Sequence, residues 1–195
     1  MLELSIHVLD IVQNSVTAGA TLIEILVCED LERDLLTVKI KDNGHAMDVE
    51  MLRKAADPFV TTKPNKKVGL GLSLLAQAAQ DASGEFEIDS VPGKGTSVTA
   101  SFVLSSVDRM PLGDMKSTLL SLVFGAPELD FAYTHNRGER TYTFDTREVR
   151  RLTGGALTSD AKTVRLVREM LERATGNEDN HKEGLGEGGS IADAH

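Results

Sequence analysis

The sequence is poor in cysteine and in aromatic residues. Cys28 is the only cysteine among 195 residues, tryptophan is absent, and aromatic residues make up 4% of the chain. A single cysteine excludes an internal disulfide and a metal site built from several thiolates. The hydrophobic fraction is an ordinary 41%, so we expect a core built mainly from aliphatic side chains.

Long apolar runs and an excess of positive charge are also missing. No apolar run approaches the ~20 residues that a membrane-spanning helix needs, and no basic-then-apolar signal segment opens the sequence. We therefore expect a cytoplasmic protein without a membrane partner. The formal net charge is −9, with 21 Lys and Arg against 30 Asp and Glu, which argues against a nucleic-acid partner. A local basic patch is present at Lys63, Lys66 and Lys67.

The first half of the sequence alternates between helical and strand patterns. Apolar residues recur every fourth position in 2–18, and Gly19 follows where a left-handed helix cap belongs. Period-two alternation predicts strands at 21–30, 35–42, 84–91 and 96–104. Helices are predicted at 48–57 and from the glycine stretch to about Ser83. This order predicts an α+β fold, a two-layer α/β sandwich with helices on one face of a mixed sheet.

The pattern changes after residue 105, and we expect three parts: a first domain at 1–105, a small α/β appendage at 106–175 and a disordered acidic tail at 176–195. The appendage has predicted helices at 110–125, 147–152 and 159–174 and a hairpin at 130–146. Asp145 and Glu148 form a predicted capping box. The tail has almost nothing to bury.

The stretch KPNKKVGLGLSLL at 63–75 raises the question of phosphate binding. It matches neither the P-loop pattern nor the three-glycine dinucleotide fingerprint, and a helix follows where a protein-kinase loop would need a strand. Taken alone, it is equally compatible with a helix start packed through its leucines.

The neighbouring motifs change that interpretation. Asp10 and Asn14 lie upstream, followed by DNGHAMD at 42–48, DPFVTTK at 57–63 and, downstream, GKGT at 93–96. In this order and spacing, over roughly residues 5–104, they resemble the Bergerat-fold (GHKL) ATP-binding domain that gyrase, the heat-shock chaperone, histidine kinases and MutL share. The region around Asn14 resembles MutL most, and the later motifs resemble histidine kinases most.

The resemblance gives roles to the first helix. Asp10 and Asn14 are four residues apart, so their side chains share one helix face. The resemblance implies that Asn14 holds the Mg²⁺ that bridges the triphosphate and that Asp10 stands where hydrolysing members place a glutamate general base. Without the other motifs, a solvent-facing polar helix face would be the simpler interpretation.

The resemblance also implies an adenine pocket. Asp42 would accept a hydrogen bond from the exocyclic amine of adenine, Gly44 would let the backbone approach the base, and Met47 would line the pocket. Thr96 would support the adenine through its hydroxyl group. The alternative for DNG is an ordinary Asx turn, and Ala46 stands where the family pattern has a second glycine.

The lysine- and glycine-rich stretch would form the lid and the phosphate end of the site. Phe59 would pack under the lid, and Lys63 and Lys67 would meet phosphate oxygens. Gly69 and Gly71 would open a helix whose N-terminus favours anions. The implied nucleotide-binding set there is Phe59, Lys63, Lys67, Gly69, Leu70, Gly71 and Leu72.

Three functions stay open at this level. Nothing in the sequence resembles the helix hairpin with a phosphoacceptor histidine that accompanies this domain in sensor kinases. The chain could therefore phosphorylate a separate partner protein, act as a slow ATPase, or serve as a non-catalytic nucleotide-sensing module. A contact surface or a homodimer interface at 106–175 is a further hypothesis.

Overall fold

The computed structural model describes residues 3–47, 52, 71–155 and 157–175. The predicted helix at 48–57, apart from Leu52, and the predicted tail at 176–195 lie outside these ranges. The helices are α1 (Leu4–Thr17), α3 (Gly71–Asp81), α4 (Met115–Gly125), α5 (Thr146–Thr153) and α6 (Ala161–Ala174). The strands are β1 (Leu22–Asp30), β2 (Leu35–Asp42), β3 (Phe86–Val91), β4 (Gly95–Val103), β5 (Asp130–Arg137) and β6 (Arg140–Asp145).

The described strands form one six-stranded mixed sheet in the order β3-β4-β2-β1-β5-β6. The β1–β2, β2–β4, β3–β4 and β5–β6 pairs are antiparallel, and β1 and β5 are parallel. Ile23 lies opposite Asp42 on one side and Phe131 on the other. This register brings the end of β2 and the start of β5 to the two sides of the start of β1.

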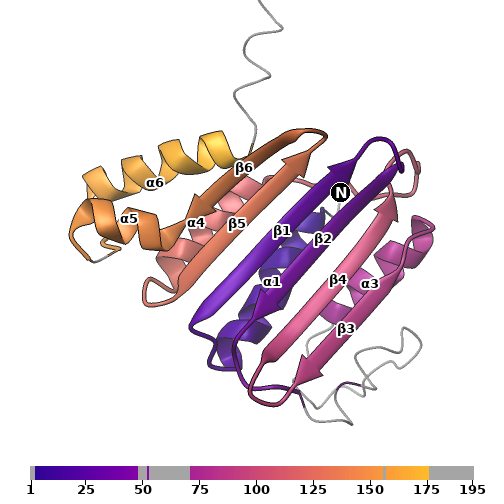
Figure 1. Cartoon of the computed structure of the whole chain (residues 1–195), viewed down its shortest axis with the longest axis horizontal. Helices are drawn as coiled ribbons and strands as arrows, with labels where there is room; N and C mark the ends of the chain where they lie inside the picture. The colour runs from indigo at the N-terminus through magenta and orange to yellow at the C-terminus, as the bar shows by residue number, and fades with distance from the viewer. Residues whose placement is uncertain (1–2, 48–51, 53–70, 156, 176–195) are drawn as a thin grey trace, which may run out of the picture.

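The helices cover one face of the sheet. In Figure 1, α1, α3 and α4 lie behind the strands, and the opposite face is turned to the viewer. On β1, Ile23, Ile25 and Val27 are buried toward the helices, whereas Glu24 between them is exposed. The predicted α+β sandwich with helices on one face of a mixed sheet is confirmed.

Residues 106–175 extend the same sheet rather than forming a second one. β5 pairs with β1 along its whole length, from Leu22–Asp130 to Glu29–Arg137. Phe131 and Tyr133 belong to the same buried cluster as Ile23 and Ile25. Because the two parts share a sheet and a core, removing residues after 105 would expose the edge of β1.

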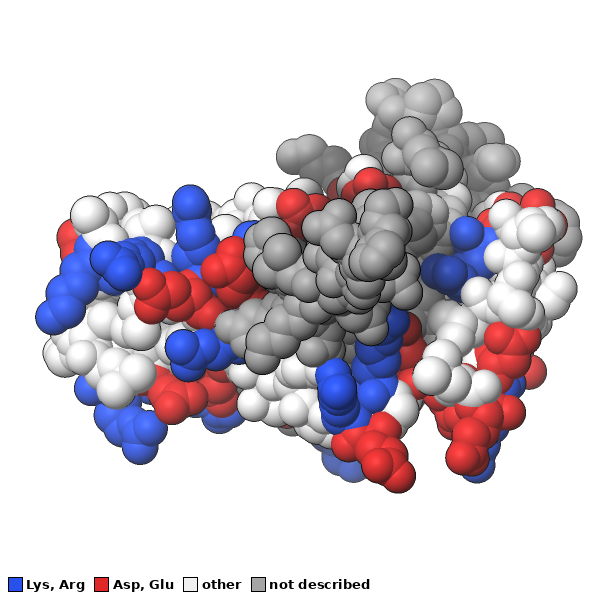
Figure 2. All heavy atoms as spheres, turned by 90° about the horizontal axis from the view of Figure 1, so that it is seen from above, with Lys and Arg blue, Asp and Glu red and all other residues white. Residues whose placement is uncertain are grey.

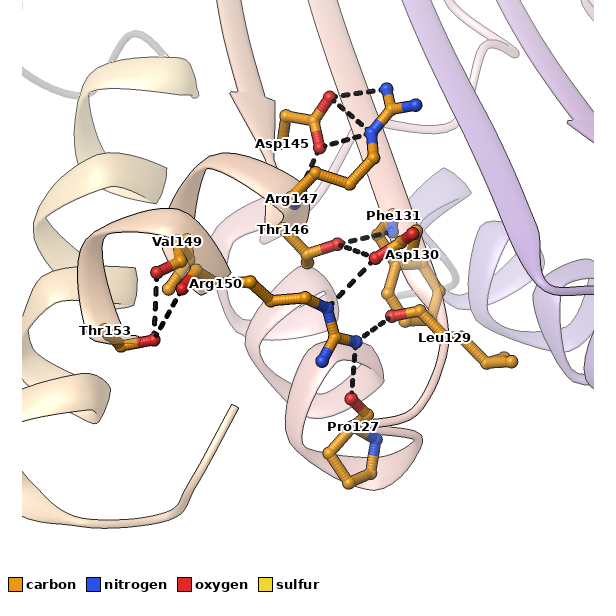
Figure 3. Close-up of polar contacts among 10 residues, drawn as sticks. All are labelled: Pro127, Leu129, Asp130, Phe131, Asp145, Thr146, Arg147, Val149, Arg150 and Thr153. Carbon is orange, nitrogen blue, oxygen red and sulfur yellow. Dashed lines mark hydrogen bonds and ion pairs between the residues drawn. The ribbon is translucent and has the colours of Figure 1, made fainter. Parts of the chain in front are cut away.

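A polar cluster holds α5 against the start of β5 (Figure 3). The Arg150 guanidinium donates to the carbonyl oxygens of Pro127 (2.6 Å) and Leu129 (2.9 Å) and to the Asp130 carboxylate (3.1 Å). The Phe131 amide donates to the Thr146 hydroxyl at 2.9 Å. These hydrogen bonds join α5 to the first residues of β5 and to the loop that precedes β5.

The predicted capping box at α5 forms in part. Asp145 is the N-cap, and its carboxylate accepts from the Arg147 amide at 2.8 Å and from the Arg147 guanidinium. Glu148 pairs with Arg151 at 3.5 Å rather than returning to the cap. Both carboxylates of the predicted capping box therefore form ion pairs with arginine side chains.

Positive and negative side chains alternate over this part of the surface. In the view from above, blue and red side chains are interspersed at the end of the molecule that carries α5 and α6 (Figure 2). Pairs such as Arg165–Glu169, at 2.8 Å, account for this pattern. Within the described ranges, no helix combines the length and apolar character that crossing a membrane requires.

Candidate nucleotide-binding site

A buried carboxylate, Asp42, forms the centre of the site at the end of β2. Its side chain is 6% exposed. One oxygen, Oδ2, accepts from the Ser15 hydroxyl at 2.6 Å, and Oδ1 accepts from the amides of Gly44 (2.9 Å) and Thr96 (3.4 Å). Since β2 alternates buried and exposed positions, its last residue turns toward α1 and away from water.

A second set of hydrogen bonds lies beside Asp42. The Ser90 hydroxyl accepts from the Met47 amide at 2.8 Å and lies 2.9 Å from the Thr96 hydroxyl. Ser90 and Thr96 face each other across the β3–β4 hairpin. The loop after β2 is thus tied to the hairpin that carries Thr96.

A pocket lies beside Asp42, and the first helix, α1, forms one of its walls. Asn14 and Ser15 both line it, and Ser15 reaches Asp42 directly. Asp10, one turn earlier, is exposed. A Cβ atom added to Gly71 would come within 2.8 Å of the Asp10 Cβ, so the start of α3 packs directly on this turn of α1.

Two glycines allow backbones to approach at this end of the sheet. A Cβ on Gly44 would lie 2.9 Å from the Ala18 carbonyl oxygen, so this glycine packs the loop against the end of α1. Gly95 has φ of +89°, and a Cβ there would overlap the Asp42 carbonyl oxygen. Both glycines therefore help to position Asp42 through contacts within the protein.

The structure brings most of the describable predicted residues together. Five of them line one pocket between α1, α3 and the sheet: Asn14, Asp42, Met47, Leu72 and Thr96. Gly44 is hydrogen-bonded to Asp42, and Asp10 contacts Gly71 at the edge of the same region. The remaining predictions lie outside the described residues: Phe59, Lys63, Lys67, Gly69 and Leu70.

Sequence reasoning missed four residues that organise the site. Ser15 and Ser90 hold Asp42 and Thr96. The Asn43 side chain accepts from the amides of Thr21 (2.8 Å) and Leu22 (3.0 Å), and His45 lies 2.8 Å from the Ala18 carbonyl oxygen through Nδ1. Ser15 carried a signal: it is a polar residue on the buried stripe of α1.

His7 is buried on the same helix and is 2% exposed. Neither ring nitrogen has a hydrogen-bond partner among the described residues. Burial lowers the pKa of the His7 imidazole, opposed by the charge of Asp10.

The donor set fits a magnesium ion that arrives with a nucleotide. Within the described ranges, no group of three or more His, Cys, Asp or Glu side chains could hold a metal ion. Mg²⁺ is commonly held by one or two protein oxygens together with phosphates and waters. Asn14 lines the pocket, and its amide oxygen would be one such ligand.

Comparison with known proteins identifies the class. The family described as "Histidine kinase-, DNA gyrase B-, and HSP90-like ATPase" matches residues 2–106, which is more than half of the chain. The chain belongs to this family. Its matched half is an ATP-binding domain of the histidine-kinase type, as the motifs predicted.

Individual relatives support this class, and each alignment covers only part of this chain and a small part of the relative. A "Putative sensor protein" of Shewanella frigidimarina (strain NCIMB 400) is 34% identical over 102 residues, covering 51% of this chain and 16% of that protein. "Sporulation kinase A" of Bacillus subtilis (strain 168) is 32% identical over 97 residues, covering 48% of this chain and 15% of that protein. The chain therefore matches about a sixth of the length of these relatives.

A solved structure extends the likeness in fold beyond the family match. The N-terminal domain of a DNA repair protein superposes with a TM-score of 0.51 at 16% identity, covering 73% of this chain and 52% of that chain. At this identity the likeness concerns the fold alone.

Proposed function

We propose that this protein binds ATP together with Mg²⁺ in the pocket around Asp42 and passes the γ-phosphate to a separate partner protein, or to water as a slow ATPase. The observation that carries the proposal is the buried Asp42 carboxylate on the wall of a pocket that Asn14 shares. The family membership supports the nucleotide, and the kinase relatives support the transfer.

The adenine end of the site follows from the hydrogen bonds of Asp42. An ionised carboxylate offers about four acceptor positions, and Ser15, Gly44 and Thr96 use three of them. The open position suits the exocyclic amine of adenine. Guanine presents a carbonyl oxygen at that place, which a carboxylate repels, so the site should select ATP over GTP.

The phosphate end would lie between α1 and the start of α3. Asn14 would hold Mg²⁺, which when bound would neutralise charge on the phosphate oxygens and orient them. The N-terminus of α3, at Gly71, favours anions through its backbone dipole. Asp10 would accept a proton from the attacking group, since its exposed carboxylate lies on this turn of α1.

A non-catalytic, nucleotide-sensing module is the second candidate. It is favoured by the identity of Asp10, because aspartate is one methylene shorter than the glutamate that hydrolysing members place four residues before the asparagine. Its Cβ already packs at the start of α3, which limits how far the carboxylate can reach.

Calorimetric titration of the full chain tests binding. ATP and ADP should bind with Mg²⁺, GTP should bind at least about tenfold more weakly, and Asn14→Ala should remove most of the gain that Mg²⁺ gives to ATP. Gln13→Ala is the matched control, because Gln13 is exposed on the neighbouring position of α1. Indifference of the wild-type chain to adenine nucleotides would end the proposal.

The reaction is tested with γ-labelled ATP. Label on a co-purified protein without free phosphate would select the kinase, and free phosphate alone would select the ATPase. In either case Asp10→Asn should abolish turnover while ATP still binds. No turnover of the wild-type chain under any condition would select the sensing module.

A further inference from the structure

A second pocket lies at the other end of the sheet. It is about 340 Å³ in volume, within the range of small-molecule sites. The start of α4 and the middle of β5 form it, and its lining residues are Leu112, Gly113, Asp114, Met115, Lys116, Tyr133, His135 and Thr175. Tyr133 and His135 pair with Ile25 and Val27 of β1, which are two and four residues from Ile23, the residue opposite Asp42, so the two sites are offset by about 7–13 Å along the strand direction.

Two deeply buried polar atoms of this pocket lack a partner in the part of the chain that the structure describes. Tyr133 is 1% exposed and His135 is 5% exposed, and both belong to β5. Among the described residues, neither Tyr133 Oη nor His135 Nδ1 has a hydrogen-bond partner. Leaving such groups unpaired in a protein interior is costly, so native folds seldom keep two of them in one pocket.

The chemistry of each atom is set by its neighbours. Burial, and to a lesser degree the Glu29 charge, raise the pKa of Tyr133, so its hydroxyl stays protonated and can donate. The His135 Nε2 lies 2.8 Å from the Glu29 carboxylate. That hydrogen bond lowers the pKa of Glu29, so the carboxylate is an acceptor and the proton lies on Nε2. In the neutral imidazole, Nδ1 is therefore an acceptor.

A cation and two apolar groups complete the pocket. The Lys116 ammonium pairs with Glu172 at 2.9 Å, which uses one of its three donors. Leu112 and Met115 supply apolar surface on the same wall. Asp114 is already committed, because it caps α4 through the Ser117 amide and hydroxyl.

We propose that this pocket binds a small carboxylic acid that carries a hydroxyl or amino group on the neighbouring carbon and an apolar side chain. The carboxylate accepts from Tyr133 Oη and Lys116 Nζ, and the hydroxyl or amino group donates to His135 Nδ1. The apolar side chain packs on Leu112 and Met115. This ligand supplies both hydrogen bonds that the protein leaves unmade.

The pocket is connected to the first helix by its own wall. The amides of Leu4 and Ser5 donate to the carbonyl oxygens of Pro111 (3.0 Å) and Leu112 (2.9 Å). The first turn of α1 thus rests on the segment that lines the second pocket, and later turns of α1 carry Asp10 and Asn14. A ligand that orders this segment has a direct contact with the helix of the nucleotide site.

The experiment uses three probes that share one skeleton: L-leucine, L-2-hydroxy-4-methylpentanoate and 4-methylpentanoate. The full chain is labelled with ¹⁵N, and the ring nitrogens of His135 are followed by NMR during each titration. At least one of the first two probes should give a saturable shift of His135 Nδ1. The third, which has no donor next to its carboxylate, should bind at least tenfold more weakly.

Variants separate the pocket from the nucleotide site. Tyr133→Phe and Lys116→Met should each lower the affinity for the probe at least tenfold and leave the affinity for ATP unchanged. Thr134→Val, between Tyr133 and His135 on the opposite face of β5, is the matched control and should change neither. The proposal is overturned if no probe shifts His135 saturably, or if Tyr133→Phe binds as tightly as the wild-type chain.

Discussion

The polar clusters around Asp42 and around His135 differ in how many of their hydrogen-bonding groups have partners within the protein. Around Asp42, carboxylate oxygens, hydroxyls and amides from α1, β2 and β4 pair with one another. Around His135, one ring nitrogen meets Glu29, but the other and the Tyr133 hydroxyl have no partner among the described residues. Both clusters lie on the helix-covered face of the same sheet.

This difference indicates two ways to prepare a binding site. Asp42 is held in one orientation before any ligand arrives, so little ordering is left for the nucleotide to impose. The cluster at His135 stays incomplete, so a ligand that completes it gains the hydrogen bonds that folding left unmade. Substitutions that break the hydrogen bonds around Asp42 should therefore lower both stability and binding, whereas removal of an unpaired group at the His135 cluster should lower binding alone.

The largest effect is expected where the backbone itself positions Asp42. Gly95→Ala places a Cβ against the Asp42 carbonyl oxygen at a φ of +89°, so the free energy of unfolding should fall by at least about 3 kcal/mol. Gly93→Ala is the matched control: φ is +76°, and the structure places nothing within 4 Å of the new Cβ. It should cost only about 1 kcal/mol. Urea unfolding measures both, and equal losses would show that Gly95 does not position Asp42.

The next effect concerns the charge of Asp42. Asp42→Asn replaces an acceptor oxygen with an amide donor, so affinity for ATP should fall by about 100-fold, since hydrogen bonds to a charged group contribute about 1.5–3 kcal/mol. Asp89→Asn, at an exposed position of β3, should bind ATP like the wild-type chain. Calorimetry measures both affinities, and an unchanged affinity of Asp42→Asn would remove Asp42 from the adenine site.

These residues also show what the sequence could predict. Strands β1 and β2 follow from the alternation around Ile23 and Ile25, and Asp42 stands out because it ends a strand before a glycine turn. Local patterns of this kind predicted most of the element boundaries, whereas the other residues of the pocket wall were predicted from the resemblance of the motifs to the Bergerat-fold family.

Contacts between distant segments could not be predicted in this way. The Ser15–Asp42 hydrogen bond joins residues 27 positions apart, and the parallel β1–β5 ladder joins residues more than 100 positions apart. Neither leaves a local period in the sequence. For the same reason, no local pattern predicts the pocket at Tyr133 and His135, which β5 forms together with the start of α4 and Thr175.

A smaller effect is expected at Ser15, which supports Asp42 without belonging to the adenine contact itself. Ser15→Ala removes the 2.6 Å hydrogen bond to Asp42 Oδ2, and unfolding free energy should fall by about 1–2 kcal/mol. ATP affinity should fall by about tenfold, because the carboxylate gains freedom. Ser97→Ala, on the outward face of β4, is the control. Loss of stability without any loss of affinity would mean that Ser15 supports only the fold.

The smallest effect on stability is expected from the hydrogen bond between His135 Nε2 and the Glu29 carboxylate. The hydrogen bond from His135 lowers the pKa of Glu29 below its ordinary value of 4.5, so the folded state gains stability from this carboxylate above pH 4.5. That gain is lost as pH falls through the lower folded-state pKa.

Glu29→Gln removes the titrating group, so its unfolding free energy should fall less than that of the wild-type chain between about pH 5 and pH 3. Urea unfolding at both ends of this range measures the difference, with Glu87→Gln, exposed on β3, as the control. If Glu29→Gln and the wild-type chain lose stability in parallel, Glu29 does not depend on His135, and the proton assignment that makes Nδ1 an acceptor loses its support.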